Sequence, residues 1–242
     1  MNAVIIPARF QSVRFPGKLL KDLAGKSVIQ RVFEKSMGSK EADLIIIATD
    51  DQRIFDHCQT FCNNVIMTSS EHTSGTDRCA EVCEKMEEVT KVVNVQGDEP
   101  FIQADQIDVC FQKLDNNKIV TLATKILSNS ELTDSNVVKV ICQKNGLAIY
   151  FSRNPIPFQR NIKLEEWYLN FNYKRHLGIY GFQADTLQKI TKMNASSLEI
   201  AESLEQLRWI ENGFDIMVMN TEHYSVGIDT PGDLEKAISK YK

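Results

Sequence analysis

The sequence predicts an α/β protein built on a mostly parallel, doubly wound sheet with helices on both faces. Three observations support this fold class. Short apolar runs alternate with amphipathic helical segments along the N-terminal part of the chain, the pattern of successive strand-helix units. The chain has 242 residues, 43% of them hydrophobic, enough for a substantial core. No Gly/Ser-rich linker and no repeat divides the chain, so we expect one domain over residues 1–242.

The first four strands are predicted from runs of Val, Ile and Leu, at residues 3–6, 44–48, 64–67 and 91–95. A polar stretch containing Pro and Gly follows the first run, so a long loop is expected there. Ser27 is placed to cap the first helix, in which apolar residues recur at helical spacing. Similar stripes after residue 51 and before residue 86 predict the next two helices.

The alternation ends after residue 100. Three strands without intervening helices are predicted, at residues 119–124, 137–142 and 147–151. The following stretch is irregular, aromatic and charged, so we expect a β-rich elaboration at about residues 150–175. The order then continues with a strand at 175–182, a helix at 197–212, a strand at 214–220 and a last helix that Thr230 caps and Pro231 opens.

Composition excludes several classes of function. The 28 Lys and Arg against 32 Asp and Glu give a net charge of −4, which does not favour a nucleic-acid partner. The longest apolar runs have strand length, so no membrane insertion is expected. The N-terminus has no pattern of a signal peptide, and six cysteines without secretory context are typical of reduced thiols. We therefore expect a cytoplasmic protein.

Charged side chains follow several of the predicted strands. Arg9, Arg14 and Lys18 come after the first strand, Asp50 after the second and Asp98 after the fourth. Ligands of open α/β sheets bind at the carboxyl ends of strands, so these groups are expected to converge. Cations suit phosphate oxygens and carboxylates suit Mg²⁺, which indicates a polyphosphate bound with a divalent metal. The alternative for each cation singly is a solvated basic loop.

The loop itself matches neither of the common phosphate-binding patterns. It lacks the Walker A spacing of glycines before its Gly-Lys pair, and it is not a G-x-G-x-x-G dinucleotide loop.

Four blocks of sequence make the interpretation specific: IPAR through RFPGK (residues 6–18), ATD (48–50), HTSGTDR (72–78) and VNVQGDEP (93–100). Later blocks are YFSR (150–153), RHLGIYG (175–181), LEQLR (204–208) and GIDTP (227–231). In these blocks the chain resembles the CMP-KDO synthetases, or 3-deoxy-manno-octulosonate cytidylyltransferases, from end to end. The resemblance implies a nucleotide-diphospho-sugar transferase-like fold whose β-rich arm serves dimerisation.

The resemblance implies an enzyme that transfers the cytidylyl group of CTP to 3-deoxy-D-manno-octulosonate (KDO), giving CMP-KDO and pyrophosphate for lipopolysaccharide biosynthesis. Mg²⁺ is the implied cofactor, CTP and KDO are the implied small-molecule partners, and a homodimer is the implied assembly. Two alternatives remain: a cytidylyltransferase for a related sugar such as 8-amino-KDO or sialic acid, and a non-catalytic nucleotide-binding protein on the same fold.

The resemblance also implies roles for individual residues. Catalysis falls to Arg9, Lys18 and Asp98, and metal binding to Asp98 and Asp229. Nucleotide binding falls to Arg9, Arg14, Lys18, Ser74, Gly75, Arg78 and Gln96. Sugar binding falls to Gln96, Arg153, His176, Tyr180, Glu205 and Gln206. Within the predicted helix 197–212, Glu202 and Gln206 share one face and would present a polar stripe to the site.

Several of these residues have a plain structural alternative. Asp229 precedes the last helix and could serve only its turn, while Ser74 could be an ordinary helix cap. A lone histidine in an apolar strand, as at His176, is more often a core residue. The aromatic residues of the arm, Trp167, Tyr168, Phe171 and Tyr173, suit either an interface or a locally folded flap.

Overall fold

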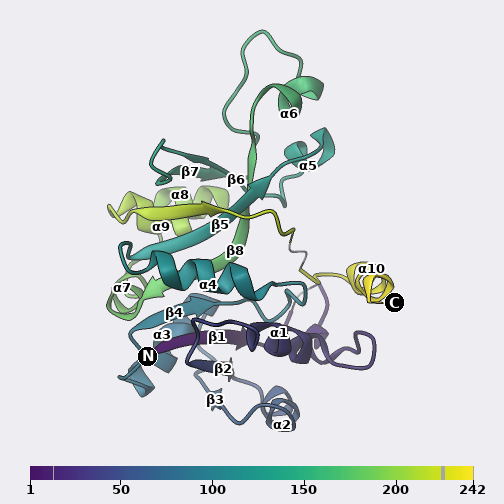
Figure 1. Cartoon of the computed structure of the whole chain (residues 1–242), viewed down its shortest axis with the longest axis vertical. Coiled ribbons are helices and arrows are strands. Elements are labelled where there is room, and N and C mark those ends of the chain that lie inside the picture. The colour runs from purple at the N-terminus through teal and green to yellow at the C-terminus, as the bar shows by residue number, and fades with distance from the viewer. Residues whose placement is uncertain (13, 225–226, 242) are drawn as a thin grey trace.

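A computed structural model of the chain describes residues 1–12, 14–224 and 227–241. Its helices and strands form one continuous mixed sheet with helices on either side (Figure 1). The strands are β1 (Asn2–Ala8), β2 (Leu44–Thr49), β3 (Val65–Met67), β4 (Lys91–Asn94), β5 (Ile119–Lys125), β6 (Lys139–Cys142), β7 (Ala148–Ser152), β8 (Lys174–Gln183) and β9 (Ile216–Asn220).

The α-helices of the described residues are α1 (Val28–Ser36), α2 (Gln52–Gln59), α3 (Gly75–Lys85), α4 (Ala104–Lys113), α5 (Asn129–Thr133), α6 (Trp167–Asn170), α7 (Ala184–Ile190), α8 (Ser197–Glu202), α9 (Gln206–Glu211) and α10 (Pro231–Lys240). The long loop predicted after the first strand is present and contains one 3-10 turn at Lys18–Leu20.

The sheet has the strand order β3-β2-β1-β4-β8-β5-β9, with the hairpin β6-β7 attached to β8. Within the group β3-β2-β1-β4 the adjacent strands run parallel to one another, and β5 runs parallel to β9. Between these groups β8 runs antiparallel to both β4 and β5. The predicted α/β fold is confirmed, but the sheet is mixed rather than mostly parallel. Among the described residues, four of its strand pairs are parallel and four are antiparallel, three of the latter involving β8 and the fourth being β6-β7.

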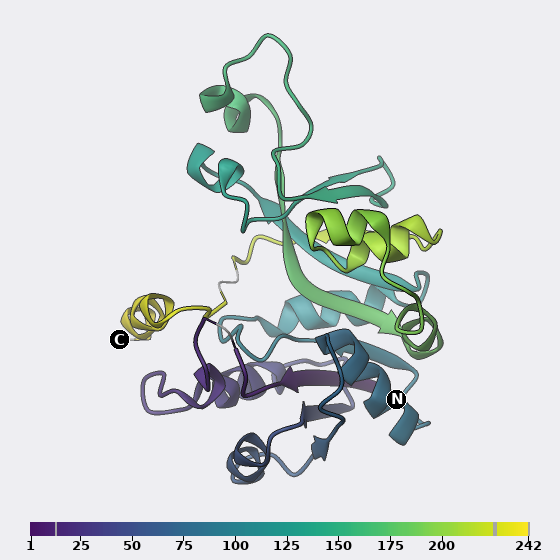
Figure 2. The same cartoon turned by 180° about the vertical axis from the view of Figure 1, so that it is seen from behind.

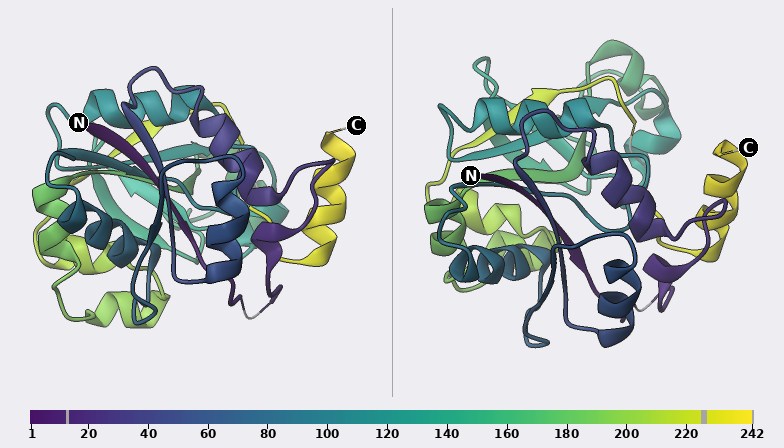
Figure 3. Two further views of the ribbon diagram at one scale, coloured as in Figure 1. Left: turned by 90° about the horizontal axis from the view of Figure 1, so that it is seen from below. Right: turned by 60° about the horizontal axis from the view of Figure 1, so that its bottom comes forward.

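Two apolar cores lie on the two faces of the sheet. The α1, α2 and α4 face buries Ile29, Ile54 and Phe111, and the opposite face buries Val82 of α3 and Trp209 of α9. Figure 2 shows α3 and the α7–α9 group on the face opposite to α4. Figure 3 shows the same layering from below. This two-sided burial explains why the central strands have apolar residues at consecutive positions.

The predicted helix starts are confirmed by the capping contacts. The Ser27 hydroxyl accepts a hydrogen bond from the Gln30 amide at the start of α1. Thr230 caps α10, with Pro231 at its first turn and with Asp233 completing a reciprocal capping pair. These side chains satisfy backbone N–H groups that a helix start leaves unpaired.

Two predictions for the second half of the chain are wrong in detail. A short helix, α5, separates β5 from β6, and the helix expected at 197–212 is two helices, α8 and α9. The break falls at Ser203, whose φ of 51° is left-handed. Periodicity missed the break because both halves place apolar residues against the same core, Leu198 of α8 partly buried and Leu207 and Trp209 of α9 fully buried. Glu202 and Gln206 therefore do not share a helix face.

Residues 153–173 form an arm that projects from the sheet, at the top of Figure 1. The expected β-rich character of this elaboration is wrong: β7 ends and β8 begins at its base, and the arm itself, described throughout, has a 3-10 turn and a short helix but no strand. It contains α6 and a small apolar cluster in which Trp167 and Tyr173 are buried against Ile126, Leu132 and Val137. Of the two alternatives for the aromatic residues of the arm, the locally folded flap describes Trp167 and Tyr173. Phe171 remains exposed.

Among the described residues, none of the helices is both long and apolar enough to span a bilayer. All six cysteines are free thiols, and five of them are buried. Burial raises the pKa of Cys58 to about 12, so this thiol is not reactive near neutral pH.

Candidate active site

Two adjoining cavities open at the carboxyl ends of β1 and β4. The larger has a volume of about 310 Å³, the smaller about 80 Å³, and both are lined by Pro7, Arg9 and Gln96. The larger cavity is also lined by Ser12, Arg14, Lys18, Leu19, Gly97, Asp98 and Asp229. The smaller is also lined by Ala8, His72, Ser74, Gly75 and Arg78. The carboxyl edge of the sheet thus gathers the residues predicted for the nucleotide.

The loop after β1 folds back on itself and so returns Lys18 to the end of that strand. Gly17 makes this possible, because its φ of 67° is left-handed and its amide donates to the Phe10 carbonyl. A Cβ atom at Gly17 would lie 2.9 Å from the Phe10 ring, so a larger residue would displace the loop. The 3-10 turn that follows begins with Lys18.

Lys18 holds two carboxylates that are distant in sequence. Its Nζ atom lies 2.5 Å from Asp98 Oδ2 and 2.9 Å from Asp229 Oδ1, and Arg14 lies 3.0 Å from the other Asp229 oxygen. Burial by itself lowers the pKa of Lys18, but the two carboxylates outweigh burial and raise the pKa above its usual value. The Asp229 side chain faces this network, while Thr230 caps the helix.

The donor set at this point fits a magnesium ion that arrives with a nucleotide. Asp98 and Asp229 already share one cation, the Lys18 ammonium. Among the described residues no group of three or more His, Cys, Asp or Glu side chains is arranged to hold a metal. Mg²⁺ in nucleotide sites is bound through one or two carboxylates, with phosphate oxygens and water completing its octahedron. Two carboxylates beside a phosphate-sized cavity match that requirement.

The smaller cavity lies at the start of α3, a helix that Ser74 caps through a reciprocal pair with Asp77. Arg78 is buried and fixed, with its guanidinium 2.9 Å from Asp50 Oδ2 and donating to the Thr68 hydroxyl. This ion pair joins the end of β2 to α3. Arg78 therefore presents a rigid wall to the cavity.

Two glycines let backbone segments approach one another around these cavities. A Cβ atom at Gly97 would lie 2.9 Å from the Pro7 carbonyl oxygen, and one at Gly75 would lie 3.0 Å from the Pro7 ring. A larger side chain at either position would push apart the ends of β1, β4 and α3. Gly75 of the HTSGTDR block and Gly97 of the VNVQGDEP block thus set the width of the site.

Glu205 connects the nucleotide side of the site to the predicted sugar side. Its carboxylate accepts hydrogen bonds from the Thr76 hydroxyl at 2.8 Å and from the Ser74 hydroxyl at 3.3 Å. Burial raises the pKa of Glu205 above its usual value, although the Thr76 hydrogen bond opposes this. The break between α8 and α9 places Glu205 at the start of α9, within reach of α3.

Two predicted sugar-binding residues carry buried polar atoms that lack a well-formed hydrogen bond. Within the described part of the chain, neither the Tyr180 hydroxyl nor the Gln206 Nε2 atom has a hydrogen bond of good geometry, and the Thr121 hydroxyl makes only a weak contact with Tyr180. Both side chains are at least nine-tenths buried. Native proteins rarely leave such groups unsatisfied, so each is an indication of a missing ligand. Tyr180 packs edge-on against Trp209 of α9, with ring centroids 5.1 Å apart.

His176 is held as a neutral ring in this region. Burial, with a smaller contribution from the neighbouring Arg175 charge, lowers its pKa to about 3. Its Nε2 atom lies 3.0 Å from the Thr121 hydroxyl, and its ring packs edge-on against Phe151. His176 therefore can offer a substrate a hydrogen bond but not the positive charge that a carboxylate prefers.

Arg153 lies apart from the two cavities. Its guanidinium donates to the carbonyls of Glu202 at 2.7 Å, Ser135 at 3.0 Å and Ser203 at 3.2 Å. It joins the turn between α8 and α9 to the loop before β6. Its role toward the sugar stays a prediction.

Sequence reasoning did not include His72 among the binding residues, although it lines the smaller cavity. Its Nε2 atom lies 2.5 Å from Glu81 Oε2, so a carboxylate fixes the ring orientation. The signal was available, since His72 opens the HTSGTDR block. Ser12, which belongs to the polar residues expected after the first strand, lines the larger cavity together with Arg9 and Arg14.

The fold and the paired cavities define a nucleotide-binding α/β protein of the nucleotidyltransferase class. Residues 3–216 match the family model described as cytidylyltransferase. The 3-deoxy-manno-octulosonate cytidylyltransferases of Parabacteroides distasonis and Porphyromonas gingivalis are each 46% identical to this chain. The first aligns over 97% of this chain and 96% of the relative, the second over 97% and 94%. The chain therefore belongs to the 3-deoxy-manno-octulosonate cytidylyltransferase family.

Solved structures agree with this assignment. A CMP:2-keto-3-deoxy-manno-octonic acid synthetase solved as a complex with CTP is 37% identical and superposes with a TM-score of 0.92, covering 99% of this chain and 98% of that chain. A 4-diphosphocytidyl-2C-methyl-D-erythritol synthase from Anaerococcus prevotii is 16% identical with a TM-score of 0.64, covering 99% and 95%. The second likeness shows the shared fold alone. The resemblance seen in the sequence motifs is confirmed.

Proposed function

We propose that this chain transfers the cytidylyl group of CTP to KDO, releasing pyrophosphate and giving CMP-KDO. The observation that carries the proposal is the convergence of Arg9, Arg14, Lys18, Asp98 and Asp229 at one cavity. This cavity adjoins a second one at the start of α3. The relatives named for this activity, and the related structure solved with CTP, support the same reaction.

In the reaction, the anomeric hydroxyl oxygen of KDO attacks the α-phosphorus of CTP. The bond from that phosphorus to the β-phosphate oxygen breaks, the pyrophosphate leaves, and the hydroxyl proton is lost to solvent or to a phosphate oxygen. Phosphoryl-type transfer depends on positioning and on neutralising charge that develops on phosphate oxygens. We assign this neutralisation to the Arg9 and Lys18 cations, with Arg14 assisting.

Asp98 and Asp229 are the residues that we propose to hold Mg²⁺. When bound, the ion supplies positive charge to the triphosphate oxygens. Lys18 then exchanges part of its contact with the two carboxylates for phosphate oxygens. Because the Lys18 ammonium is buried beside both carboxylates, it is already oriented into the larger cavity.

We assign cytosine and ribose to the smaller cavity and the sugar acid to the buried surface around Tyr180 and Gln206. The orphaned atoms of these two side chains require hydrogen-bonding partners, which sugar hydroxyls supply. Gln96 lines both cavities and packs beside Gly178 in the middle of β8, so it lies between the phosphates and the sugar. Glu205 contributes acceptors on the same side.

The test is a pyrophosphate-release assay with CTP, Mg²⁺ and each of three sugars: KDO, 8-amino-KDO and sialic acid. We expect pyrophosphate release to require CTP, Mg²⁺ and a sugar together, and to be fastest when the sugar is KDO. Faster turnover with another sugar would reassign the substrate within the same class. Tight CTP binding by calorimetry without turnover of any sugar would instead establish a non-catalytic nucleotide-binding protein.

The proposal includes a homodimer in the cytoplasm. Exposed apolar residues on the arm, Phe158, Leu169 and Phe171, supply surface that a second copy would cover. Free thiols throughout the described chain are compatible with a reducing compartment, where CTP is available. Sedimentation analysis of the purified protein measures the assembly directly, and a monomer would contradict this part.

A further inference from the structure

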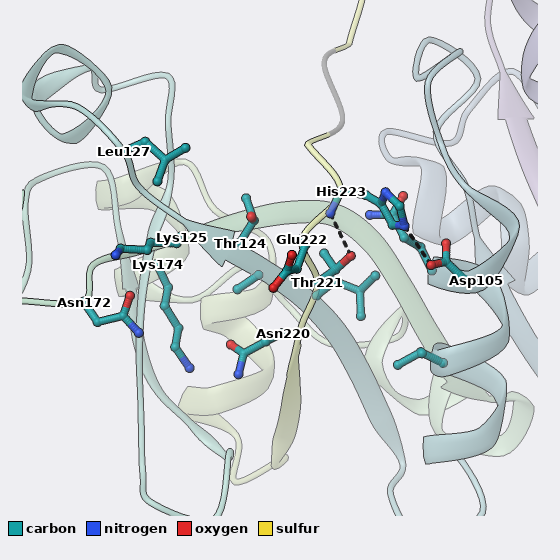
Figure 4. A pocket seen from close by; sticks show the side chains of 14 residues that line it. Asp105, Thr124, Lys125, Leu127, Asn172, Lys174, Asn220, Thr221, Glu222 and His223 are labelled. Carbon is teal, nitrogen blue, oxygen red and sulfur yellow. Dashed lines mark hydrogen bonds and ion pairs between the residues drawn. The ribbon is translucent and has the colours of Figure 1, made fainter.

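A cavity of about 700 Å³ lies between α4 and the carboxyl ends of β5 and β9 (Figure 4). It is lined by the first turns of α4, the end of β5, the start of β8, and β9 with the segment that follows it. We call it the α4–β9 cavity. None of the residues assigned above to CTP, Mg²⁺ or KDO lines it. Its volume falls in the range typical of small-molecule sites.

The position of this cavity is one that open α/β sheets use for ligands. The neighbours β5 and β9 are parallel, and their carboxyl ends, at Thr124 and Asn220, both line the cavity. The apolar floor that a ligand can reach is formed by the half-buried Val109 of α4 and the exposed Leu127, with the fully buried Leu122 and Ala123 of β5 behind them. An apolar floor under polar walls suits an organic molecule rather than a simple ion.

Gln106 of α4 gives the first indication of a ligand. Its side chain is 2% exposed and lines the cavity, yet its Nε2 donor has no partner among the residues that the structure describes. Its Oε1 atom is satisfied by the Gln103 amide at 3.0 Å, which fixes the side chain. A fixed, buried donor without an acceptor destabilises the folded chain unless a ligand or water satisfies it.

Two lysines give the second indication. Lys125 of β5 and Lys174 of β8 are direct partners across the antiparallel pair, and neither forms an ion pair with a described residue. Like charges placed directly opposite repel each other, so this end of the cavity favours an anion. Figure 4 shows both lysines with Asn172 at one end of the cavity and the His223–Asp105 pair at the other.

Glu222 narrows the class of ligand. In Figure 4 its carboxylate lies between the two ends, with Thr221 and Asn220 nearby. A bare anion would be repelled by this carboxylate, whereas hydroxyl groups on the ligand would donate hydrogen bonds to it. The cavity therefore combines a cationic end with a middle that suits hydroxyls.

We propose that the α4–β9 cavity binds a hydroxylated organic anion, of the sugar phosphate or sugar acid class. Its anionic group lies between Lys125 and Lys174, its hydroxyls bond Glu222 and the Gln106 amide, and its carbon skeleton covers Val109. The site is separate from the cytidylyl transfer proposed above, and ligand binding to it does not depend on that activity.

The experiment is calorimetric titration of the full chain without CTP or Mg²⁺, using two probes, glucose 6-phosphate and gluconate. Glucose and inorganic phosphate are the comparison ligands. We expect saturable binding of one or both probes and at least tenfold weaker binding of each comparison ligand, about the effect of losing one charge-assisted hydrogen bond. The stronger probe distinguishes a phosphate from a carboxylate as the anionic group.

Three variants locate the binding. Lys125→Gln/Lys174→Gln should weaken it about tenfold or more, and Gln106→Met should weaken it to a smaller extent. The control Lys189→Gln/Lys192→Gln removes two lysine charges around α7 and should change nothing. Folding of every variant is checked by circular dichroism, and excess CTP should not displace the probe.

Four results would overturn the proposal. They are the absence of binding by either probe, equal binding of a comparison ligand, binding unchanged in the Lys125/Lys174 variant, and displacement of the probe by CTP. A dimer that dissociates on the Lys125/Lys174 change would also overturn it, because the cavity would then be an interface between copies of the chain.

Discussion

Individual side chains in this protein owe their function to partners far away in sequence. In the sequence Lys18 is one cation of a loop, and the fold places Asp98 and Asp229 within 2.9 Å of its ammonium. Tyr180 and Gln206 differ from ordinary core residues because each carries a buried polar atom that lacks a well-formed hydrogen bond within the described chain. At the residue scale, the site is identified by which polar groups are satisfied and which are left for a substrate.

Replacement of Asp98 tests the proposed metal ligand. We expect Asp98→Asn to lower the rate of pyrophosphate release by about a hundredfold or more, because charge neutralisation at the triphosphate is lost. Nucleotide-dependent Mg²⁺ affinity, measured by calorimetry, should fall as well. The free energy of unfolding, measured in urea, should change by about 1 kcal/mol or less, since Asp229 still pairs with Lys18. The control Asp56→Asn alters an exposed carboxylate on α2 and should leave both properties intact; a fully active Asp98→Asn enzyme would refute the role.

A pair of tyrosines separates a ligand-binding hydroxyl from a structural one. We expect Tyr180→Phe to raise the KM for the sugar about tenfold while the free energy of unfolding stays equal or increases, because its buried hydroxyl has only a weak contact with Thr121 and no hydrogen bond of good geometry within the described chain. Tyr173→Phe is the matched change: its hydroxyl donates to the Pro157 carbonyl at 2.6 Å, so stability should fall by about 1 kcal/mol with KM unchanged. Equal behaviour of the two variants would contradict the assignment.

At the scale of elements, α3 is the part that organises the nucleotide side. Its start carries Ser74, Gly75 and Arg78, and its middle carries Glu81, which accepts from the Ser69 amide, from Lys85 and from His72. The loop before α3 is therefore tied to the helix by one carboxylate. This contact holds His72 beside the smaller cavity.

The pH dependence of stability should report this contact. Burial opposes ionisation of Glu81, but Lys85, the Ser69 amide and His72 outweigh burial and lower its pKa from 4.5 to about 2. A carboxyl with a lowered folded-state pKa stabilises the fold above its unfolded-state pKa, and this stabilisation is lost as the pH falls through the folded-state value. Urea unfolding should thus show Glu81→Gln less stable than wild type near pH 7, with the difference shrinking between about pH 4.5 and 2. The neighbouring exposed Glu84→Gln should show a smaller difference at every pH, and an identical profile for both would reject the contact.

At the scale of the whole molecule, the arm is organised separately from the sheet. Its aromatic residues pack in a third cluster with Leu132 and Val137, distinct from the two cores on the faces of the sheet. A unit with its own small core can open without global unfolding. The arm and the catalytic edge should therefore respond differently to mutation.

Hydrogen exchange measures this independence. In Trp167→Ala we expect faster amide exchange over residues 126–137 and 156–173, with exchange in β1 and β4 unchanged, because Trp167 packs only in the cluster of the arm. Trp209→Ala, which removes a ring from the main core, should instead raise exchange throughout the sheet. If Trp167→Ala also exposes β1, the arm and sheet form one cooperative unit.

Local signals in the chain predict its fold class, the order of most elements and the family, because strand periodicity, helix caps and glycine-containing motifs need no distant partner. The sequence also predicts that the residues after β1 and β4 converge, since the carboxyl ends of parallel strands share one edge. The block from IPAR to RFPGK indicated the phosphate residues, the HTSGTDR block the cytosine residues and the VNVQGDEP block the proposed metal ligand Asp98, and the two cavities bring these residues together.

Other features are visible only in the folded chain. They are the break at Ser203, the neutral state of His176, the carbonyl contacts of Arg153 and the pairing of His72 with Glu81. The packing of the chain also decides which polar atoms of the described residues are left without a well-formed hydrogen bond, including those of Tyr180, Gln206 and Gln106. These properties depend on burial and on partners separated by tens of residues, and neither periodicity nor motif spacing records them. Hydrogen-bond satisfaction is a property of the packed molecule, and in this protein it marks the sites where ligands are expected.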